Sequence, residues 1–267
     1  MVHGSKSIDH YWVNISELPY FRALLRAVEA RFYEGIDLGR PILDLGCGDG
    51  QFVTTAFSEK IDIGLDPWTA PVLEASGRGG YLSVVQGSGY DLPFPDDSFA
   101  SAMSNSVLEH IPDLDRTLAE VARVLRPGGR FVFCVPNHQF LPTLSISSFF
   151  DGIGLKFLGN LYRGFFNRIS RHHHCDSPEV WRTRLEEHGF VLDDWWHYFS
   201  PAAFHTLEWG HYLGLPSLIV HVVTREWILV KKRWNLSLTN RIVGKHYNAE
   251  PKTPQGVYTF YIAHVAE

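Results

Sequence analysis

A glycine-rich turn that carries two acidic residues follows an apolar run near the start of the chain. The stretch 42–50 reads ILDLGCGDG, with Asp44 before the turn, Gly46, Gly48 and Gly50 within it, and Asp49 between the last two glycines. Glycines let a backbone approach a ligand closely, and a helix that begins after them points unpaired N–H groups at that ligand. Turns of this kind commonly receive a phosphate, which two carboxylates would repel. The turn is therefore expected to bind a ligand that carries positive charge.

A third carboxylate, Asp66, ends the next apolar run, 20 residues after Gly46. In this position of an α/β sheet a carboxylate can accept hydrogen bonds from both hydroxyls of a ribose. S-adenosylmethionine has a ribose, a sulfonium and an ammonium group, and it has no phosphate. The sequence therefore favours this ligand over a nicotinamide dinucleotide. The alternative is that Asp44 and Asp66 only end strands in solvent.

Strand-like and helical segments alternate through the first half of the chain. Apolar runs predict strands at 41–45, 61–65, 81–86, 100–107 and 130–136, and two more at 191–199 and 257–266. The apolar periodicity of 113–125 predicts a helix that the sequence RPGG ends. This alternation is typical of parallel strands. The expected fold class is α/β: a doubly wound, Rossmann-like, seven-stranded, mostly parallel sheet with helices on both faces and a helical, aromatic lid.

Three other segments are predicted to be helical and to lie outside this core. They are 17–34, which is amphipathic, 152–171, which mixes apolar and basic positions, and 177–190, which opens with a capping Ser and a Pro. We expect one domain over 1–267. It comprises an N-terminal helical segment (1–37), a cofactor-binding core (38–137) and a C-terminal part (138–267) with the last two strands and the lid insertions.

Composition limits the class of partner. The 267 residues are 45% hydrophobic, enough for a substantial core, and a net charge of −5 argues against nucleic acid. Three widely spaced cysteines predict no disulfide framework and a reducing, cytoplasmic location. The first residues lack the apolar core of a signal peptide, and no run reaches the roughly 20 apolar residues that span a bilayer. The oligomeric state is not predicted.

The motifs, in their order, resemble a class I S-adenosylmethionine-dependent methyltransferase of the small-molecule type that includes the ubiquinone and menaquinone biosynthetic enzymes. The matching stretches are ILDLGCGDG, IGLDPW, the run from DLPFPDDSF to FVFCVPN, and EEHGF, all within 38–190. The resemblance implies S-adenosyl-L-methionine as cofactor and S-adenosyl-L-homocysteine as product. The cofactor-binding positions it implies are Tyr11, Asp44, Gly46, Cys47, Gly48, Asp49, Gly50, Asp66, Pro67, Trp68, Ser88, Gly89, Asn105 and Ser106.

The resemblance also implies where each group lies. Asp44 and the turn would hold the methionine end and Asp66 the ribose. Pro67 and Trp68 would flank the adenine, and Ser88 and Gly89 would lie along its polar edge. The methyl donor would be bordered by Ser104, Asn105 and Ser106. Tyr11 and Trp12 would close the site. The family commonly has Gly-Asp before its LPF segment, where this chain has Gly87-Ser88. Ser88 or Asp91 must then replace the usual carboxylate.

Methyl transfer is an in-line displacement, and a protic nucleophile would need a general base. The candidates are His138, after the fifth strand, and His174, within RHHHCD; the alternative for both is a polar loop role. Alternation would direct His172 and His174 to the same side, but contiguous residues cannot all reach one centre, so no metal site is predicted. By the resemblance, Glu109 and His110 begin the segment after the fourth strand and are not catalytic.

The two lid insertions, 137–176 and 200–256, are rich in aromatic residues. They would enclose an apolar or aromatic acceptor, or lay a basic, aromatic face on a membrane to receive a lipid-linked one, or only pack against the sheet. The expected function is methyl transfer to an O, N or C nucleophile of a small organic acceptor. The alternatives are a partner-dependent cofactor-binding protein without activity of its own and, less favoured, a nicotinamide oxidoreductase.

Overall fold

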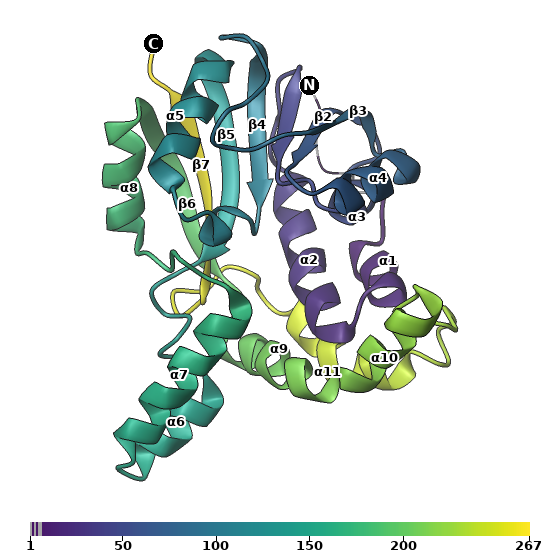
Figure 1. Ribbon diagram of the computed structural model, residues 1–267. Coiled ribbons are helices and arrows are strands. Elements are labelled where there is room, and N and C mark those ends of the chain that lie inside the picture. The colour runs from purple at the N-terminus through teal and green to yellow at the C-terminus, as the bar shows by residue number, and fades with distance from the viewer. Residues whose placement is uncertain (1, 3, 5–6) are drawn as a thin grey trace.

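The computed structural model describes residues 2, 4 and 7–267, so residues 1, 3, 5 and 6 of the expected N-terminal segment lie outside the described residues. Seven strands in the described chain form one sheet, in the order β3-β2-β1-β4-β5-β7-β6 (Figure 1). They are β1 (Ile42–Leu45), β2 (Ile61–Asp66), β3 (Tyr81–Gln86), β4 (Phe99–Asn105), β5 (Leu125–Pro136), β6 (Phe190–Tyr198) and β7 (Tyr258–Val265). The first five run parallel, and β7 is antiparallel to both of its neighbours. The predicted fold class is confirmed.

Helices cover both faces of the sheet. On one face, α2 (Tyr20–Tyr33) and α3 (Gln51–Ala56) contribute buried residues to a core cluster, and α4 (Thr69–Arg78) adds Ala75. On the other face, α5 (Leu114–Val124) and α8 (Pro178–Glu187) pack the apolar stripe of α5 and the indole of Trp181 into a second cluster. The central strands β1 and β4 are therefore buried between two apolar layers, whereas the edge strand β3 is mostly uncovered.

Two helix predictions need correction at their ends. The helix predicted over 17–34 is α2, which begins three residues later, at Tyr20. A separate helix that was not predicted, α1 (His10–Glu17), precedes it and ends before Pro19, which lacks the N–H that would continue the helix. The α1 helix begins at a cap, where the Asp9 carboxylate accepts from the Trp12 N–H at 3.0 Å. Pro178 occupies the first turn of α8 as predicted, but the Ser177 side chain makes no capping hydrogen bond.

The lid is helical, as predicted, and lies below the sheet in Figure 1. It consists of a hairpin of α6 (Ser145–Gly152) and α7 (Lys156–Ser170), and of α9 (Pro201–Leu213), α10 (Leu215–Thr224) and α11 (Ser237–Asn248). The α9 and α11 helices pack against α2, whereas the α6–α7 hairpin projects away from the sheet (Figure 1). Across the described residues, no helix combines the length and the apolar character needed to cross a membrane.

Candidate functional site

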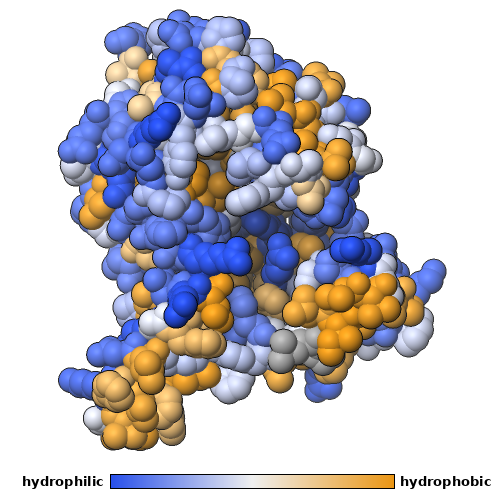
Figure 2. Space-filling model, viewed as in Figure 1, coloured by the Kyte–Doolittle hydropathy of each residue, from blue (hydrophilic) through white to orange (hydrophobic). Residues whose placement is uncertain are grey.

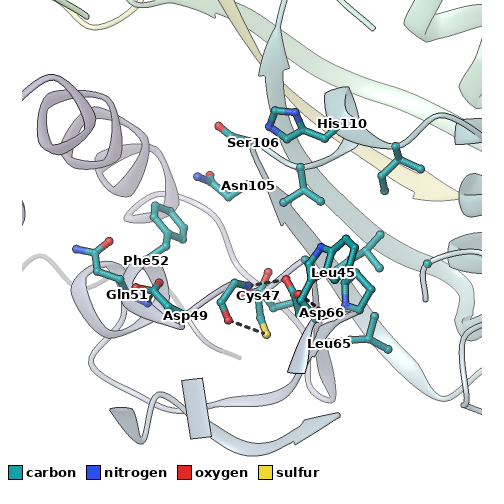
Figure 3. Close-up of a pocket in the computed structure, with 18 of the residues that line it drawn as sticks. Leu45, Cys47, Asp49, Gln51, Phe52, Leu65, Asp66, Asn105, Ser106 and His110 are labelled. Carbon is teal, nitrogen blue, oxygen red and sulfur yellow. Dashed lines mark hydrogen bonds between the residues drawn. The ribbon is translucent and has the colours of Figure 1, made fainter. Parts of the chain in front are cut away.

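A cavity of about 670 Å³ lies at the carboxyl ends of β1, β2 and β4. Figure 3 shows Cys47, Asp49 and Asp66 toward one end of it and Ser106 and His110 toward the other. The cavity brings together most of the residues that the sequence predicted. Those that line it are Asp44, Gly46, Cys47, Gly48, Asp49, Asp66, Pro67, Trp68, Ser88, Gly89, Asn105 and Ser106.

The glycine turn is fixed against the end of β2. The N–H groups of Gly46 and Cys47 both donate to the Leu65 carbonyl, at 2.8 and 3.0 Å. Gly46 has φ +79°, and a Cβ at this position would overlap the side chain of Val107. Only glycine satisfies both the backbone angle and the space. The turn is therefore held in one conformation at the edge of the cavity.

Asp66 is buried and held by two backbone donors. Its Oδ2 accepts from the Gly48 N–H and its Oδ1 from the Trp68 N–H, both at 3.0 Å. A carboxylate oxygen can accept more than one hydrogen bond, so each oxygen keeps acceptor capacity toward the cavity. The carboxylate is therefore oriented before any ligand arrives.

Asp44 is a buried acid whose proton is poised near neutrality. Burial raises its pKa to about 7, and the charge of Asp66 adds to that rise. The Tyr81 hydroxyl, which donates to Asp44 Oδ2 at 2.6 Å, and the charge of Arg26 oppose it. Asp49, by contrast, is exposed and lies 3.3 Å from an Arg78 nitrogen, so its charge is balanced within the chain.

Polar side chains on the buried face of α2 were missed by the sequence analysis. Arg22, Arg26 and Glu29 lie three or four residues apart on a helix predicted only as amphipathic, and that spacing was the available signal. Glu29 is fully buried and accepts from Arg26 Nη1, Asn105 Nδ2, Ser106 Oγ and Tyr198 Oη, at 3.0, 2.6, 3.2 and 2.8 Å. This Glu29 cluster ties the end of β4 to α2 and β6.

A second cavity, of about 280 Å³, adjoins the first and shares with it the side chains of Arg22, Arg26, Ser106 and His110. Its other walls are mostly apolar or aromatic. They comprise Phe21, Leu25, Phe140, Ile169, Leu207 and Tyr258, with Glu109, His172 and His211 as further polar members.

Glu109, His110 and His172 meet in this second cavity. Their ligand-type atoms all lie within 4.8 Å of one another, so of the described residues these three could hold a divalent cation or move a proton. Burial raises the pKa of Glu109 to about 8, and its Oε2 has no hydrogen-bond partner. Burial lowers the pKa of His110, and burial together with the charge of His110 lowers that of His172 to about 3.

The chain brings this cluster together from separate segments, which is why the sequence did not reveal it. Glu109 and His110 lie in the short 3₁₀ helix η1 (Leu108–His110), and His172 follows α7. The N–H groups of His173 and His174 reach the Glu109 carbonyl at 2.7 and 3.3 Å, which holds the histidine segment beside η1.

Several predicted site residues lie outside both cavities. The His138 ring lies 5.9 Å from that of His197, and His174 Nε2 lies 3.0 Å from the Ile111 carbonyl oxygen. His172 and His174 therefore serve different neighbours instead of facing one centre from the same side, because the segment is not an extended strand. Tyr11 stacks on Tyr247 with ring centroids 4.9 Å apart.

Four other residues near the turn have structural contacts. The Trp12 ring lies beneath the guanidinium of Arg233, 4.6 Å from the ring centroid. Ser104 donates to the Leu45 carbonyl at 2.9 Å, which ties β4 to β1, and Asp91 forms an isolated bridge with Ser88. Gly50, with φ +76°, begins α3 beside the turn without lining the cavity.

On the lid side, the aromatic residue that lines the cavity is Trp227.

Comparison with known proteins matches part of the chain to one protein family. Residues 43–133 match the family described as "Methyltransferase domain". The chain is 32% identical over 130 residues to a "Probable S-adenosylmethionine-dependent methyltransferase" of Mycolicibacterium smegmatis, covering 48% of this chain and 47% of that one. It is 36% identical over 100 residues to a fatty-acid O-methyltransferase of the same species, covering 36% of each. A demethylmenaquinone methyltransferase of Corynebacterium kroppenstedtii is 34% identical over 110 residues, covering 40% of this chain and 46% of that one.

The chain thus spans about half the length, or less, of the curated relatives it matches. Solved structures resemble it over a longer stretch. A phosphoethanolamine N-methyltransferase of Haemonchus contortus in complex with S-adenosyl-L-methionine has a TM-score of 0.55 at 18% identity, over 91% of this chain and 52% of that one. The [4+2]-cyclase SpnF has a TM-score of 0.54 at 18% identity, over 92% of this chain and 82% of that one. The matched residues include the glycine turn, Asp66 and β4, and with the observed sheet they show that the chain carries a class I S-adenosylmethionine-dependent methyltransferase domain.

Proposed function

We propose that this chain transfers the methyl group of S-adenosylmethionine to an O, N or C nucleophile of a small, apolar acceptor by in-line displacement. The observation that carries the proposal is the junction of two cavities. The acidic turn lines the first, aromatic and aliphatic side chains line part of the second beside its charged and polar ones, and Ser106 and His110 lie where they meet. A donor in the first cavity and an acceptor in the second would face each other across this junction.

The proposed cofactor position follows from charge and exposure. Asp66 receives the ribose hydroxyls, and Asp44 with the turn faces the cationic methionine end. Trp68, whose side chain is 71% exposed, lies at the rim beside the proposed adenine position. Ser88 Oγ accepts from the Tyr90 N–H at 3.2 Å, which leaves its hydroxyl hydrogen free for the adenine edge.

Arg22 supplies the positive charge that the acidic turn lacks. It lines both cavities, and no carboxylate among the described residues lies within ion-pair distance of it. The methionine end of the cofactor has a carboxylate as well as an ammonium group. We place that carboxylate at Arg22, because a guanidinium without a carboxylate partner gains most from an anion.

The second cavity suits an apolar acceptor with one polar reacting group. Its aromatic and aliphatic walls favour a ring or chain, and its polar members surround the junction. Two of the relatives are named as a fatty-acid O-methyltransferase and a demethylmenaquinone methyltransferase, and both names specify an apolar acceptor.

We assign the general-base role for a hydroxyl acceptor to His110, in place of His138 and His174. His110 Nδ1 lies 3.1 Å from the Arg171 carbonyl oxygen and donates to it in the tautomer that leaves Nε2 as the acceptor. Because burial lowers its pKa below the usual 6.5, the ring is neutral at pH 7 and able to take a proton.

Methyl-labelled S-adenosylmethionine tests this function. The enzyme is incubated with pools of apolar acids, phenols and amines, and label in the organic products is counted. We expect transfer by the wild type. For a hydroxyl acceptor, His110→Gln should lower kcat about 100-fold with little change in S-adenosylhomocysteine affinity.

His138→Gln is the matched control, and we expect it to behave as the wild type. Cofactor binding without transfer to any pool would contradict the proposal and support the partner-dependent alternative. Equal loss in both histidine variants would contradict the assignment of His110.

A further inference from the structure

Two lid elements present apolar side chains to solvent on the same side of the molecule. On α7, Phe157, Leu161, Phe165 and Ile169 are spaced four residues apart and are 77, 62, 50 and 44% exposed; we call them the α7 stripe. On α10, Leu218, Ile219, Val222 and Val223 are 45, 67, 67 and 77% exposed; we call them the α10 face. Figure 2 shows them as two hydrophobic areas, at the lower left and lower right. Exposed apolar patches of this kind mark interaction surfaces.

These elements also concentrate positive charge. Segments 144–171 and 214–249 contain ten of the 24 Lys and Arg residues but only two of the 29 acidic ones. Lys156, Lys232 and Arg241 are exposed, and no acidic side chain among the described residues pairs with them. The rest of the chain has 14 basic and 27 acidic residues, so the charge of the molecule is strongly segregated.

Both surfaces continue into the walls of the site. Ile169, the last member of the α7 stripe, lines the second cavity, and Trp227, which follows α10, lines the first. An apolar molecule that enters from either surface would therefore reach the cavities by way of apolar side chains.

From this arrangement we infer that the α7 stripe and the α10 face dock the protein on an anionic lipid surface. Helices with an apolar face and Lys or Arg on their flanks lie in the membrane interface, and anionic headgroups attract the flanking cations. A second copy fits less well, because pairing the two faces would bring like charges together. That the surface delivers an acceptor from the lipid rests on the proposed function; the docking itself does not.

Vesicle sedimentation of the full chain, without cofactor or acceptor, tests this inference. We expect tighter binding to phosphatidylcholine vesicles with 30% phosphatidylserine than to phosphatidylcholine alone. Two pairs of substitutions, Phe157→Ser with Leu161→Ser and Ile219→Ser with Val223→Ser, should each weaken binding about tenfold or more. The matched control is Leu73→Ser with Leu82→Ser, on α4 and β3, where the side chains are 67 and 65% exposed. That control should bind as the wild type does.

Substitutions that remove positive charges provide an independent test of the same inference. Lys156→Gln, Lys232→Gln and Arg241→Gln should each weaken binding to the anionic vesicles about fivefold, whereas Lys60→Gln and Arg182→Gln should not. The inference is overturned by absence of binding, by binding that neither set alters, or by a dimer in light scattering that the apolar substitutions dissolve. Vesicle binding without methyl transfer would count against the proposed function alone, and methyl transfer without vesicle binding against this inference alone.

Discussion

We predict that Asp44 couples cofactor binding to the release of a proton. Because burial holds its pKa at about 7, the free protein contains a large protonated fraction at neutral pH. A cationic ligand beside it favours the ionised form, so binding should release a proton. We predict that S-adenosylmethionine affinity rises about tenfold per pH unit below pH 7 and levels off above pH 8.

Calorimetry in two buffers of different ionisation enthalpy measures that proton. We expect release approaching one proton at pH 6, and none in Asp44→Asn. Affinity that is constant from pH 6 to pH 8 would place the cationic end of the ligand away from Asp44.

Glu109 makes the free energy of unfolding fall as the pH rises, whereas an acid paired with a cation makes it rise. Its pKa is raised to about 8 from the usual 4.5, so the folded chain keeps a proton that the unfolded chain releases between these values. Its contribution to stability is present below pH 4.5 and is lost as the pH rises through 8.

Glu109→Gln should remove this dependence. We predict that, between pH 5 and pH 9, the wild type loses about 4 kcal/mol more unfolding free energy than the variant, in urea titrations at both pH values. Glu186→Gln, on the exposed face of α8, should follow the wild type. Parallel losses in the wild type and Glu109→Gln would show that Glu109 ionises normally in the folded protein.

At the scale of single residues, the sequence predicted those site residues that belong to short contiguous motifs. The turn, Asp66 and Asn105 line the cavity because they follow strands whose carboxyl ends meet at one edge of the sheet. Arg22 and His172 could not be placed this way. Each reaches the site only through the packing of a helix or loop that is distant in the sequence.

At the scale of elements, the Glu29 cluster is the principal link between α2 and the sheet edge. Four donors converge on this carboxylate, and three of them come from β4, the residue after it, and β6. Removing one partner of a buried charged network leaves the others without a partner. We predict that Glu29→Ala lowers the unfolding free energy by about 3 kcal/mol or more, as measured in urea.

Glu186→Ala serves as the control and should cost less than about 0.5 kcal/mol, because its side chain is exposed. Glu29→Gln should be intermediate, since it keeps the shape and one acceptor but removes the charge. A loss in Glu29→Ala no larger than in the control would mean that α2 is held by its apolar contacts alone.

The elements themselves were more predictable than the site. The strand predicted at 81–86 has those bounds in the structure, although β3 is an edge strand of which Tyr81 alone is buried. The strand predicted at 130–136 begins five residues earlier, at Leu125, because Leu125 also pairs with β4; the RPGG segment between them is an irregularity with Gly128 at φ +71°, and regular pairing resumes at Arg130. The helix predicted from residue 17 begins at Tyr20, after Pro19, and the α1 helix before it was not predicted.

At the scale of the whole molecule, the fold does not determine the reaction. The solved structures that resemble this chain include N-methyltransferases and a [4+2]-cyclase, at similar TM-scores. The lid of this chain contributes part of the second cavity, two apolar surfaces and ten of the 24 Lys and Arg residues. Specificity is therefore expected to reside in 137–176 and 200–256.

The central claim is that the acidic turn and Asp66 form a site for an S-adenosyl ligand and not for a dinucleotide. Isothermal titration calorimetry of the wild type, Asp66→Asn and Glu74→Gln with S-adenosylhomocysteine and with NAD tests it most directly. Glu74 is an exposed acid on the neighbouring α4 helix and controls for the change in charge. The account predicts that the wild type and Glu74→Gln bind S-adenosylhomocysteine alike, that Asp66→Asn binds it about tenfold more weakly or worse, and that NAD gives no heat of binding. Tight NAD binding with no response to S-adenosylhomocysteine would contradict it.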